Sequence, residues 1–194
     1  MKYGSSNSKY CYPGTEVLIN KLDIKDDSLL REAEELYSAQ RLLELAVEPL
    51  MGNFDLQHLQ RLHHYIFQDL FPFAGLIREE NISKGGTPFA QSQYIVPIAT
   101  DLFNKLKSEH HLENTNNEVF SNRAAYYLSE INAIHPFREG NGRAIREFIR
   151  TLALRSNFNL NWDSVAITEL LNASIESIKD YTHLSDCIMR CINS

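Results

Sequence analysis

The chain has 194 residues, a formal net charge of −6 and 43% hydrophobic residues, which is the size and composition of one soluble globular domain. The negative charge argues against direct nucleic-acid binding, because gripping phosphate backbones requires concentrated positive charge. The longest apolar stretches, such as 42–50, fall well short of the roughly 20 residues that a bilayer span needs, and no apolar segment follows Lys2 as in a secretory signal. We therefore expect a cytoplasmic protein with a single domain over residues 1–194 and no membrane partner.

The three cysteines, Cys11, Cys187 and Cys191, cannot all pair with one another. Cys187 and Cys191 lie one helical turn apart, where they would share a helix face and not join two elements. A metal site built on these two residues and His183 would need a fourth ligand. We expect free thiols in a reducing compartment.

Apolar residues recur at helical spacing along most of the chain, which predicts a mostly α-helical fold. The first helix is expected over about 28–50, with Asp26 and Asp27 at its start and Met51 after its end. Its predicted inward stripe consists of Leu29, Ala33, Leu36 and Leu43.

A second helix is expected over about 55–70, where Phe71 and Pro72 stop it. Its histidines, His63 and His64, are interpreted as structural, because no carboxylate or cysteine stands at ligand spacing. The residues predicted to face inward are Leu59, Leu62, Ile66 and Leu70.

The segment 75–94 is the one stretch without a helical pattern. Its Gly-Gly pair between short apolar pieces predicts a β-hairpin, with an expected extent of about 81–91. The residues at its centre are Ile82, Ser83, Lys84, Gly85, Gly86, Thr87, Pro88 and Phe89.

Helical spacing resumes after the hairpin. A helix over 94–107 is predicted to bury Ile95, Ile98, Leu102 and Leu106. The next helix, 117–134, is apolar on two faces and is expected to be central. The remaining predicted helices run from the interruption at 135–142 to about 155, and over 164–179 and 182–192.

The interruption between the two central helices carries the candidate chemistry, in the run HPFREGNGR from His135 to Arg143. Pro136 biases His135 away from helical dihedral angles, so the helix should end there and present the imidazole beside a loop. Phe137 is expected to anchor that loop in the core. A histidine with an ordinary pKa near 6.5 can take a proton from a hydroxyl at neutral pH.

The second half of the run has the residues of a polyphosphate site. Gly140 and Gly142 permit an anion-binding turn at the start of the next helix, whose dipole adds positive potential. Arg143 and Arg146 lie three residues apart and project from one helix face. Glu139 beside them is the carboxylate that a phosphate-bound Mg²⁺ would require. Together these residues indicate phosphoryl or nucleotidyl transfer.

The run HPFREGNGRAIR resembles the signature of the Fic family, H-x-F-x-[DE]-G-N-G-R-x-x-R, at every fixed position. The sequence upstream of the motif is also similar to that of Fic proteins. The similar parts are Tyr12-Pro13-Gly14-Thr15, the stretch HHYIFQDLFPFAG over 63–75, and Arg78. The resemblance implies a small, free-standing, toxin-like member of the Fic/Doc superfamily. The expected fold is an all-α Fic-type helical domain with a short β-hairpin flap beside an active site at 135–146.

By this resemblance the chain would be a protein adenylyltransferase that uses ATP and Mg²⁺. Glu139 would hold the metal, Gly140, Asn141, Gly142 and Arg143 would hold the phosphates, and Arg146 would hold the γ-phosphate. His135 would deprotonate a Tyr, Thr or Ser hydroxyl of a target protein, which then attacks the α-phosphorus. The flap would dock the target by adding its backbone as a strand.

Two other functions remain as alternatives. The first is a Doc-like protein phosphotransferase, a class that carries Lys where this chain has Gly142 and lacks the second arginine. The second is a non-catalytic nucleotide-binding module, which would be expected to lose His135 or Glu139. Both residues are present here.

The resemblance also bears on regulation and partners. Fic proteins restrain themselves with a helix of pattern [ST]-x-x-x-E-[GN], and only Ser28 to Glu32 fits its five-residue core here, followed by Ala33. A separate small antitoxin protein is therefore expected, as in toxin–antitoxin pairs. The analogy extends to the target, which in such pairs is a type II topoisomerase subunit.

Overall fold

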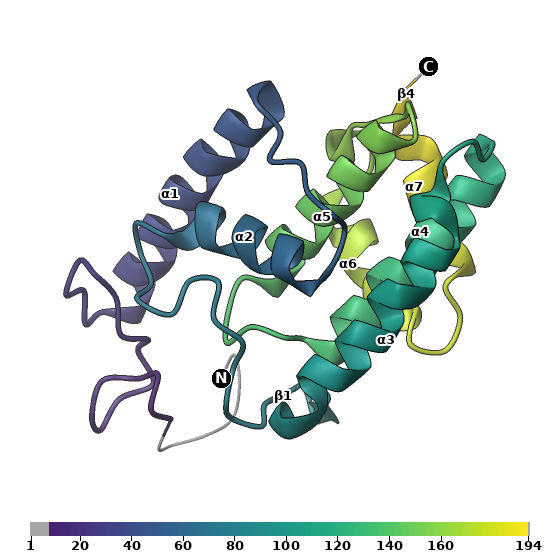
Figure 1. Cartoon of the computed structure of the whole chain (residues 1–194). Coiled ribbons are helices and arrows are strands. Elements are labelled where there is room, and N and C mark those ends of the chain that lie inside the picture. Colours follow the sequence, from purple (N-terminus) through teal and green to yellow (C-terminus); the bar gives the residue numbers. More distant parts are fainter. Residues whose placement is uncertain (1–7, 194) are drawn as a thin grey trace.

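The computed structural model describes residues 8–193 and is mostly helical, as the sequence predicts (Figure 1). The helices of this part of the chain are α1 (Asp27–Val47), α2 (Leu56–Phe67), α3 (Ile95–Ser108), α4 (Asn117–Ile134), α5 (Asn141–Arg155), α6 (Ile167–Glu176) and α7 (Thr182–Cys191). Single 3₁₀ turns lie at Ser92–Tyr94, His110–Leu112 and Trp162–Ser164. The predicted hairpin is present as the antiparallel strands β1 (Ser83–Lys84) and β2 (Thr87–Pro88). A second pair, β3 (Asn159–Leu160) with β4 (Ile192–Asn193), was not expected.

Side-chain caps explain where three of the helices begin. Asp26 accepts hydrogen bonds from the first backbone amides of α1, Asp55 accepts one from His58 at the start of α2, and Asn116 accepts one from Val119 at the start of α4. Each cap satisfies an amide that has no partner within its own helix. The predicted start of α1 is therefore confirmed, whereas its end lies at Val47, before the expected limit of 50.

Helix α5 lies at the centre of the fold. It packs against α2 on one side and α4 on the other, while α1 covers α2, and α3 and α7 pack against α4 (Figure 1). The face of α5 that carries Ala144, Ile145, Phe148 and Leu152 is fully buried. The start of α5 is therefore held from both sides, and this is where the motif lies.

The inward face predicted for α1 is wrong. Leu29, Leu36 and Leu43 are exposed, the last two by 70%, and the face that packs inward carries Leu30, Glu34, Ser38 and Leu45. A prediction from periodicity places leucines in the core. The inward face of α1 instead carries the Glu34 carboxylate and the Ser38 hydroxyl, which contact Arg143 of α5. Polar partners, and not apolar area alone, therefore set the rotation of this helix.

The other predicted core residues are buried with one exception. In α3, Ile95, Leu102 and Leu106 are buried, but Ile98 is 45% exposed because Ala99 and Phe103 occupy the inward positions. The four inward residues predicted for α2 are all buried.

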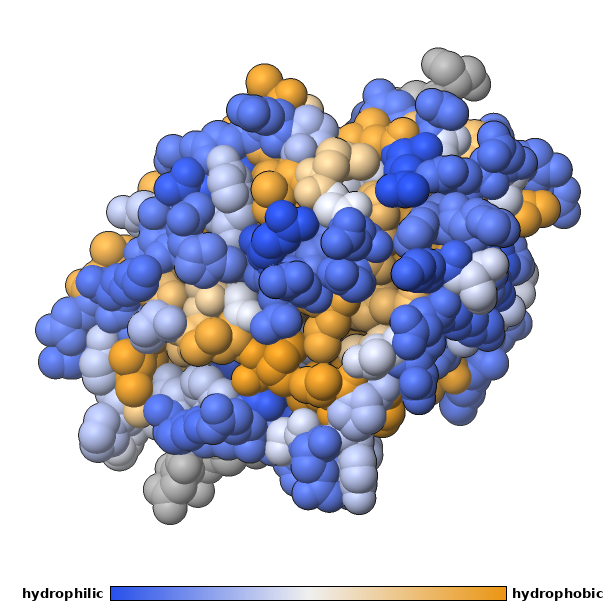
Figure 2. Space-filling view, viewed as in Figure 1, coloured by the Kyte–Doolittle hydropathy of each residue, from blue (hydrophilic) through white to orange (hydrophobic). Residues whose placement is uncertain are grey.

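The surface of the face shown in Figure 2 is largely hydrophilic, with apolar side chains gathered near its middle. Across residues 8–193, no helix combines the length and the apolar character that a membrane crossing requires.

Candidate active site

His135 stands where α4 ends. Its amide donates to the Ile131 carbonyl at 2.9 Å, which closes the last helical turn, and its own backbone is left-handed, with φ 50° and ψ 64°. The following Pro136 disfavours the helical region for His135, so the chain leaves the helix at this residue. The side chain is buried beside the motif loop.

Two contacts orient the imidazole of His135. Its Nδ1 lies 3.1 Å from the Asn132 carbonyl oxygen, which can only accept a hydrogen bond, so Nδ1 carries the proton and Nε2 carries the lone pair. The ring of Phe89 stacks on it, with centroids 3.8 Å apart and planes at 15°. Burial, with a smaller effect from the Arg78 charge, lowers the pKa of His135 to about 3. The neutral form that can accept a proton therefore dominates at neutral pH.

The motif loop is held by side chains from α2 and from its own end. His63 stacks on Phe137, with centroids 3.8 Å apart, and its Nε2 donates to the Glu139 carbonyl at 2.8 Å while its Nδ1 accepts from the Gly75 amide. The side chain of Asn141 bonds both the amide and the carbonyl of Phe137, at 2.9 and 2.8 Å. Phe137 is fully buried, as expected for an anchor. The loop is thus fixed before any ligand arrives.

Gly140 provides the turn from the loop into α5. Its φ is +76°, and a Cβ there would lie 2.3 Å from ring carbons of Phe67, so only glycine fits. No side chain caps α5 within the described part of the chain. The amides of its first turn, from Asn141 to Arg143, are consequently positioned for an anionic ligand.

The two arginines of α5 have different surroundings. Arg143 donates to the Glu34 carboxylate and, at 2.7 Å, to the Ser38 hydroxyl, both on α1. Among the side chains that the structure describes, from residue 8 to 192, none forms a hydrogen bond or ion pair with Arg146. Burial, and then the charge of Arg143, lower the pKa of Arg146 below its ordinary value. This crowding of positive charge favours an anion beside both guanidinium groups.

Glu139 is buried at the end of the loop, and its Oε1 accepts a hydrogen bond from the Gly140 amide at 3.0 Å. A carboxylate oxygen is a hard ligand of the kind that Mg²⁺ prefers, and Mg²⁺ in nucleotide sites takes one or two carboxylates together with phosphates. The donor chemistry therefore fits a nucleotide-bound magnesium ion.

The predicted flap lies next to His135. Ser83 pairs with Pro88 and Lys84 with Thr87, and Gly85 and Gly86 turn the chain with φ of 57° and 82°. Ile82 is buried at the base of the hairpin, whereas the residues of its tip are exposed. Within residues 8–193 the two strands pair only with each other, and they lie beside the candidate base.

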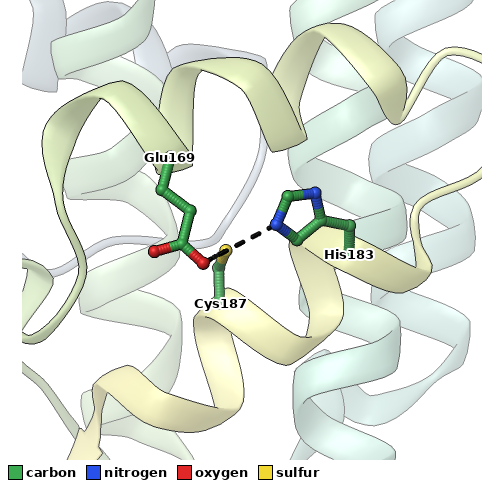
Figure 3. A group of neighbouring side chains, drawn as sticks. All are labelled: Glu169, His183 and Cys187. Carbon is green, nitrogen blue, oxygen red and sulfur yellow. Dashed lines mark hydrogen bonds and ion pairs between the residues drawn. The ribbon is translucent and has the colours of Figure 1, made fainter.

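A second cluster of polar side chains lies away from the motif, where Glu169 of α6 meets His183 and Cys187 of α7 (Figure 3). Glu169 Oε1 lies 3.7 Å from His183 Nε2 and 4.0 Å from Cys187 Sγ. Arg190 donates to the same carboxylate oxygen and lies 3.6 Å from the sulfur. The guanidinium already supplies the positive charge at this place, so we describe the cluster as an ion-pair network between two helices. The three cysteines are free and buried, in agreement with the sequence.

Fold and motif together define a Fic domain. The Fic/DOC family model matches residues 53–153, and the chain belongs to this family. It is 39% identical over 189 residues to protein adenylyltransferase VbhT of Bartonella schoenbuchensis, a match that covers 97% of this chain and 40% of that protein. It is 36% identical over 194 residues to the probable protein adenylyltransferase y4lH of Sinorhizobium fredii, covering 99% of this chain and 100% of that protein.

A solved structure shares the whole fold. The BepC protein of Bartonella tribocorum, crystallised with bound AMPPNP, superposes with a TM-score of 0.89 at 25% identity and covers 95% of this chain and 96% of its own. The chain thus spans nearly all of that Fic structure but less than half of VbhT.

Several residues of the site were not recognised from the sequence as parts of it. Glu34 and Ser38 reach it from α1, and His63 was expected to be structural without a link to the motif. Arg78 was noted only as part of the Fic-like sequence upstream of the motif, yet it donates to the His135 carbonyl. A carboxylate on the inward side of α1 is the one signal that could have revealed Glu34.

Proposed function

We propose that this chain is a protein adenylyltransferase that transfers AMP from ATP to a Tyr, Thr or Ser hydroxyl of another protein. The observation that carries the proposal is the buried neutral His135 imidazole at the end of α4, joined by the motif loop to the uncapped start of α5, which carries Arg143 and Arg146. The relatives VbhT, named protein adenylyltransferase, and y4lH, named probable protein adenylyltransferase, support the same activity.

In this mechanism His135 is the general base. Its Nδ1 is held by the Asn132 carbonyl, so Nε2 takes the proton of the target hydroxyl. The hydroxyl oxygen forms a bond to the α-phosphorus while the bond from that phosphorus to the β-phosphate bridging oxygen breaks. Pyrophosphate leaves and carries the electron pair, and the product is an AMP ester of the target side chain.

The start of α5 would hold the phosphates. The amides of Asn141 and Gly142 and the Arg143 guanidinium would face the negative charge, and Arg146 would bind the γ-phosphate. The Gly140 amide, which donates to Glu139 Oε1, would exchange that bond for a phosphate oxygen. The side chain of Asn141 is already bonded to Phe137, so its part in binding falls to its backbone. Because these donors are fixed before binding, little reorganisation opposes the transition state.

Glu139 would hold Mg²⁺ through its carboxylate. When bound, the ion neutralises part of the phosphate charge and orients the leaving group.

The flap, from Ile82 to Phe89, would dock the target by strand addition. Its exposed tip and its position against His135 support this role. Docking there would bring a hydroxyl of the target segment towards Nε2.

Regulation by a separate small antitoxin in a cytoplasmic toxin–antitoxin pair is part of the proposal. Glu32, the residue at inhibitory spacing, is exposed on α1, and the described residues leave the Arg146 guanidinium available to a phosphate. A type II topoisomerase subunit remains the proposed target by analogy alone.

The test uses ATP labelled separately at the α- and γ-phosphates, incubated with the chain and a bacterial lysate. We expect α-label on protein and none from the γ-position. Protein carrying γ-label would instead establish a Doc-like phosphotransferase, and nucleotide binding without transfer of either label would establish a non-catalytic module.

A further inference from the structure

Arg78 is an almost fully buried arginine, 1% exposed, on the segment between α2 and the flap. Its Nε donates to the His135 carbonyl at 2.8 Å and its Nη1 donates to the Glu80 carbonyl at 2.6 Å. Its Nη2 donates to the carbonyls of Ala90 and, at 3.2 Å, Ile134. A charge this deeply buried is costly unless it is hydrogen-bonded, and these bonds offset that cost.

The four acceptors within the described residues belong to two different parts of the site. Glu80 and Ala90 flank the flap on either side, whereas Ile134 and His135 form the end of α4. Backbone bonds strengthen the same joint, since the Arg78 amide donates to Pro136 at 2.9 Å. One guanidinium therefore connects both ends of the flap to the backbone of the candidate base.

The flap depends on this joint for its position. Its tip turns through Gly85 and Gly86, where a Cβ would meet nothing within 4 Å, so packing at the tip does not place the hairpin. At its base, Phe89 immediately precedes Ala90 and stacks on the His135 ring. Holding the Ala90 carbonyl consequently also holds Phe89 over the imidazole.

We propose that Arg78 is a positioning residue that fixes the base of the flap relative to His135, so that a segment docked on the flap presents its hydroxyl to Nε2. The inference rests on the proposed adenylyltransfer. Lysine cannot replace arginine in this role, because one ammonium group lacks the planar fork of donors that reaches carbonyls on two sides.

The experiment compares Arg78→Lys and Arg78→Met with the wild type. Arg123→Met is the control, because Arg123 is a partly buried arginine that pairs with Glu109 and lies on α4 away from the motif. The first readout is hydrogen exchange at the amides of Phe89 and Ala90, which bond the carbonyls of Ile82 and Ala133. The second is the half-saturating concentration of ATP and of lysate protein in the α-label assay.

In both Arg78 variants we expect exchange at these two amides to accelerate about tenfold or more. Transfer should fall about tenfold or more and half-saturation should need more lysate protein, while half-saturating ATP stays within about threefold. The control should keep wild-type exchange at the flap. Unchanged exchange in the Arg78 variants, or a loss of ATP affinity that parallels the loss of transfer, would overturn the proposal.

Hydrogen exchange also keeps the result decisive in two other cases. If the wild type transfers no AMP, the proposed function fails, but hydrogen exchange still tests whether Arg78 connects the flap to the end of α4. If neither Arg78 variant folds, hydrogen exchange in the wild type tests the proposal. If Arg78 couples the flap to His135, the amides of Ala90 and His135 should open with one common free energy. Clearly separate opening free energies would show that Arg78 does not couple the flap to the base.

Discussion

Arg143 of α5 is bonded to Glu34 of α1, a residue 109 positions earlier in the sequence. The Ser38 hydroxyl, one turn further along α1, accepts from the same guanidinium at 2.7 Å. Helix α1 lies outside the range 53–153 that the family model matches. A helix outside the matched range therefore contacts Arg143, one of the proposed phosphate ligands.

This pair predicts an effect of Glu34→Gln on both stability and ATP binding. Without ATP the half-buried Arg143 loses its counter-charge, so unfolding should become easier by about 1–3 kcal/mol. ATP should bind several-fold more tightly, because the phosphates no longer compete with a carboxylate for the arginine. Thermal melting with and without ATP measures both effects. The exposed Glu32→Gln is the control, and weaker ATP binding by Glu34→Gln would contradict this interpretation.

His135→Ala should abolish transfer of the α-label. The imidazole acts on the incoming hydroxyl and not on the phosphates, so the dissociation constant of ATP should stay within about threefold of the wild-type value. Equilibrium binding of a fluorescent ATP analogue and the α-label assay separate the two effects. The exposed His64→Ala provides a histidine control. A variant that kept a large part of the wild-type rate would exclude His135 as the base.

Self-inhibition is tested by Glu32→Gly. Glu32 is exposed on α1, so its removal should cost about 1 kcal/mol of helix stability and leave transfer no faster. The isolated wild-type chain should transfer AMP without any step that first removes an inhibitory segment. Initial rates of α-label transfer provide the measurement, and a many-fold rise in the variant would show that the chain carries its own inhibitor.

Two glycines with similar backbone angles should respond differently to alanine. Gly140 and Gly86 have φ of 76° and 82°, but a Cβ meets the Phe67 ring only at Gly140. Gly86→Ala should cost about 1 kcal/mol from the left-handed backbone, and Gly140→Ala about 2–3 kcal/mol more from the clash. Urea unfolding measures the difference. An equal loss of unfolding free energy in the two variants would show that the motif loop can shift away from Phe67 and that contact with Phe67 does not fix its conformation.

Acidification should destabilise the fold through His58. Burial lowers the pKa of His58 below its ordinary value of 6.5, and its Nε2 contacts the Leu50 carbonyl at 2.8 Å. Below pH 6.5 the unfolded chain binds the proton more readily than the folded chain, so stability is full above this pH and is lost as the pH falls.

The variant His58→Gln should reduce the acid slope of the unfolding free energy by up to about 1.4 kcal/mol per pH unit. Urea unfolding at a series of pH values between 5 and 7.5 would measure it, with the exposed His64→Gln as the control. An unaltered slope in His58→Gln would mean that His58 takes up its proton within the fold.

The sequence alone predicted the features that depend on residues close together in the chain. Helical spacing predicted the helices, Gly85 and Gly86 predicted the hairpin, and the run from His135 to Arg146 predicted the family and the site. These features depend on residues that are close along the chain, where backbone preference and short motifs act directly.

Tertiary structure decided the parts of the site that depend on distant residues. Spacing alone placed Leu36 in the core, but α1 is rotated so that Glu34 meets Arg143 and Leu36 faces solvent. The four carbonyls around Arg78 likewise come together only when the flap and the end of α4 are packed side by side. A buried charge is satisfied by whatever acceptors the packed fold brings within reach, and sequence periodicity carries no record of those acceptors.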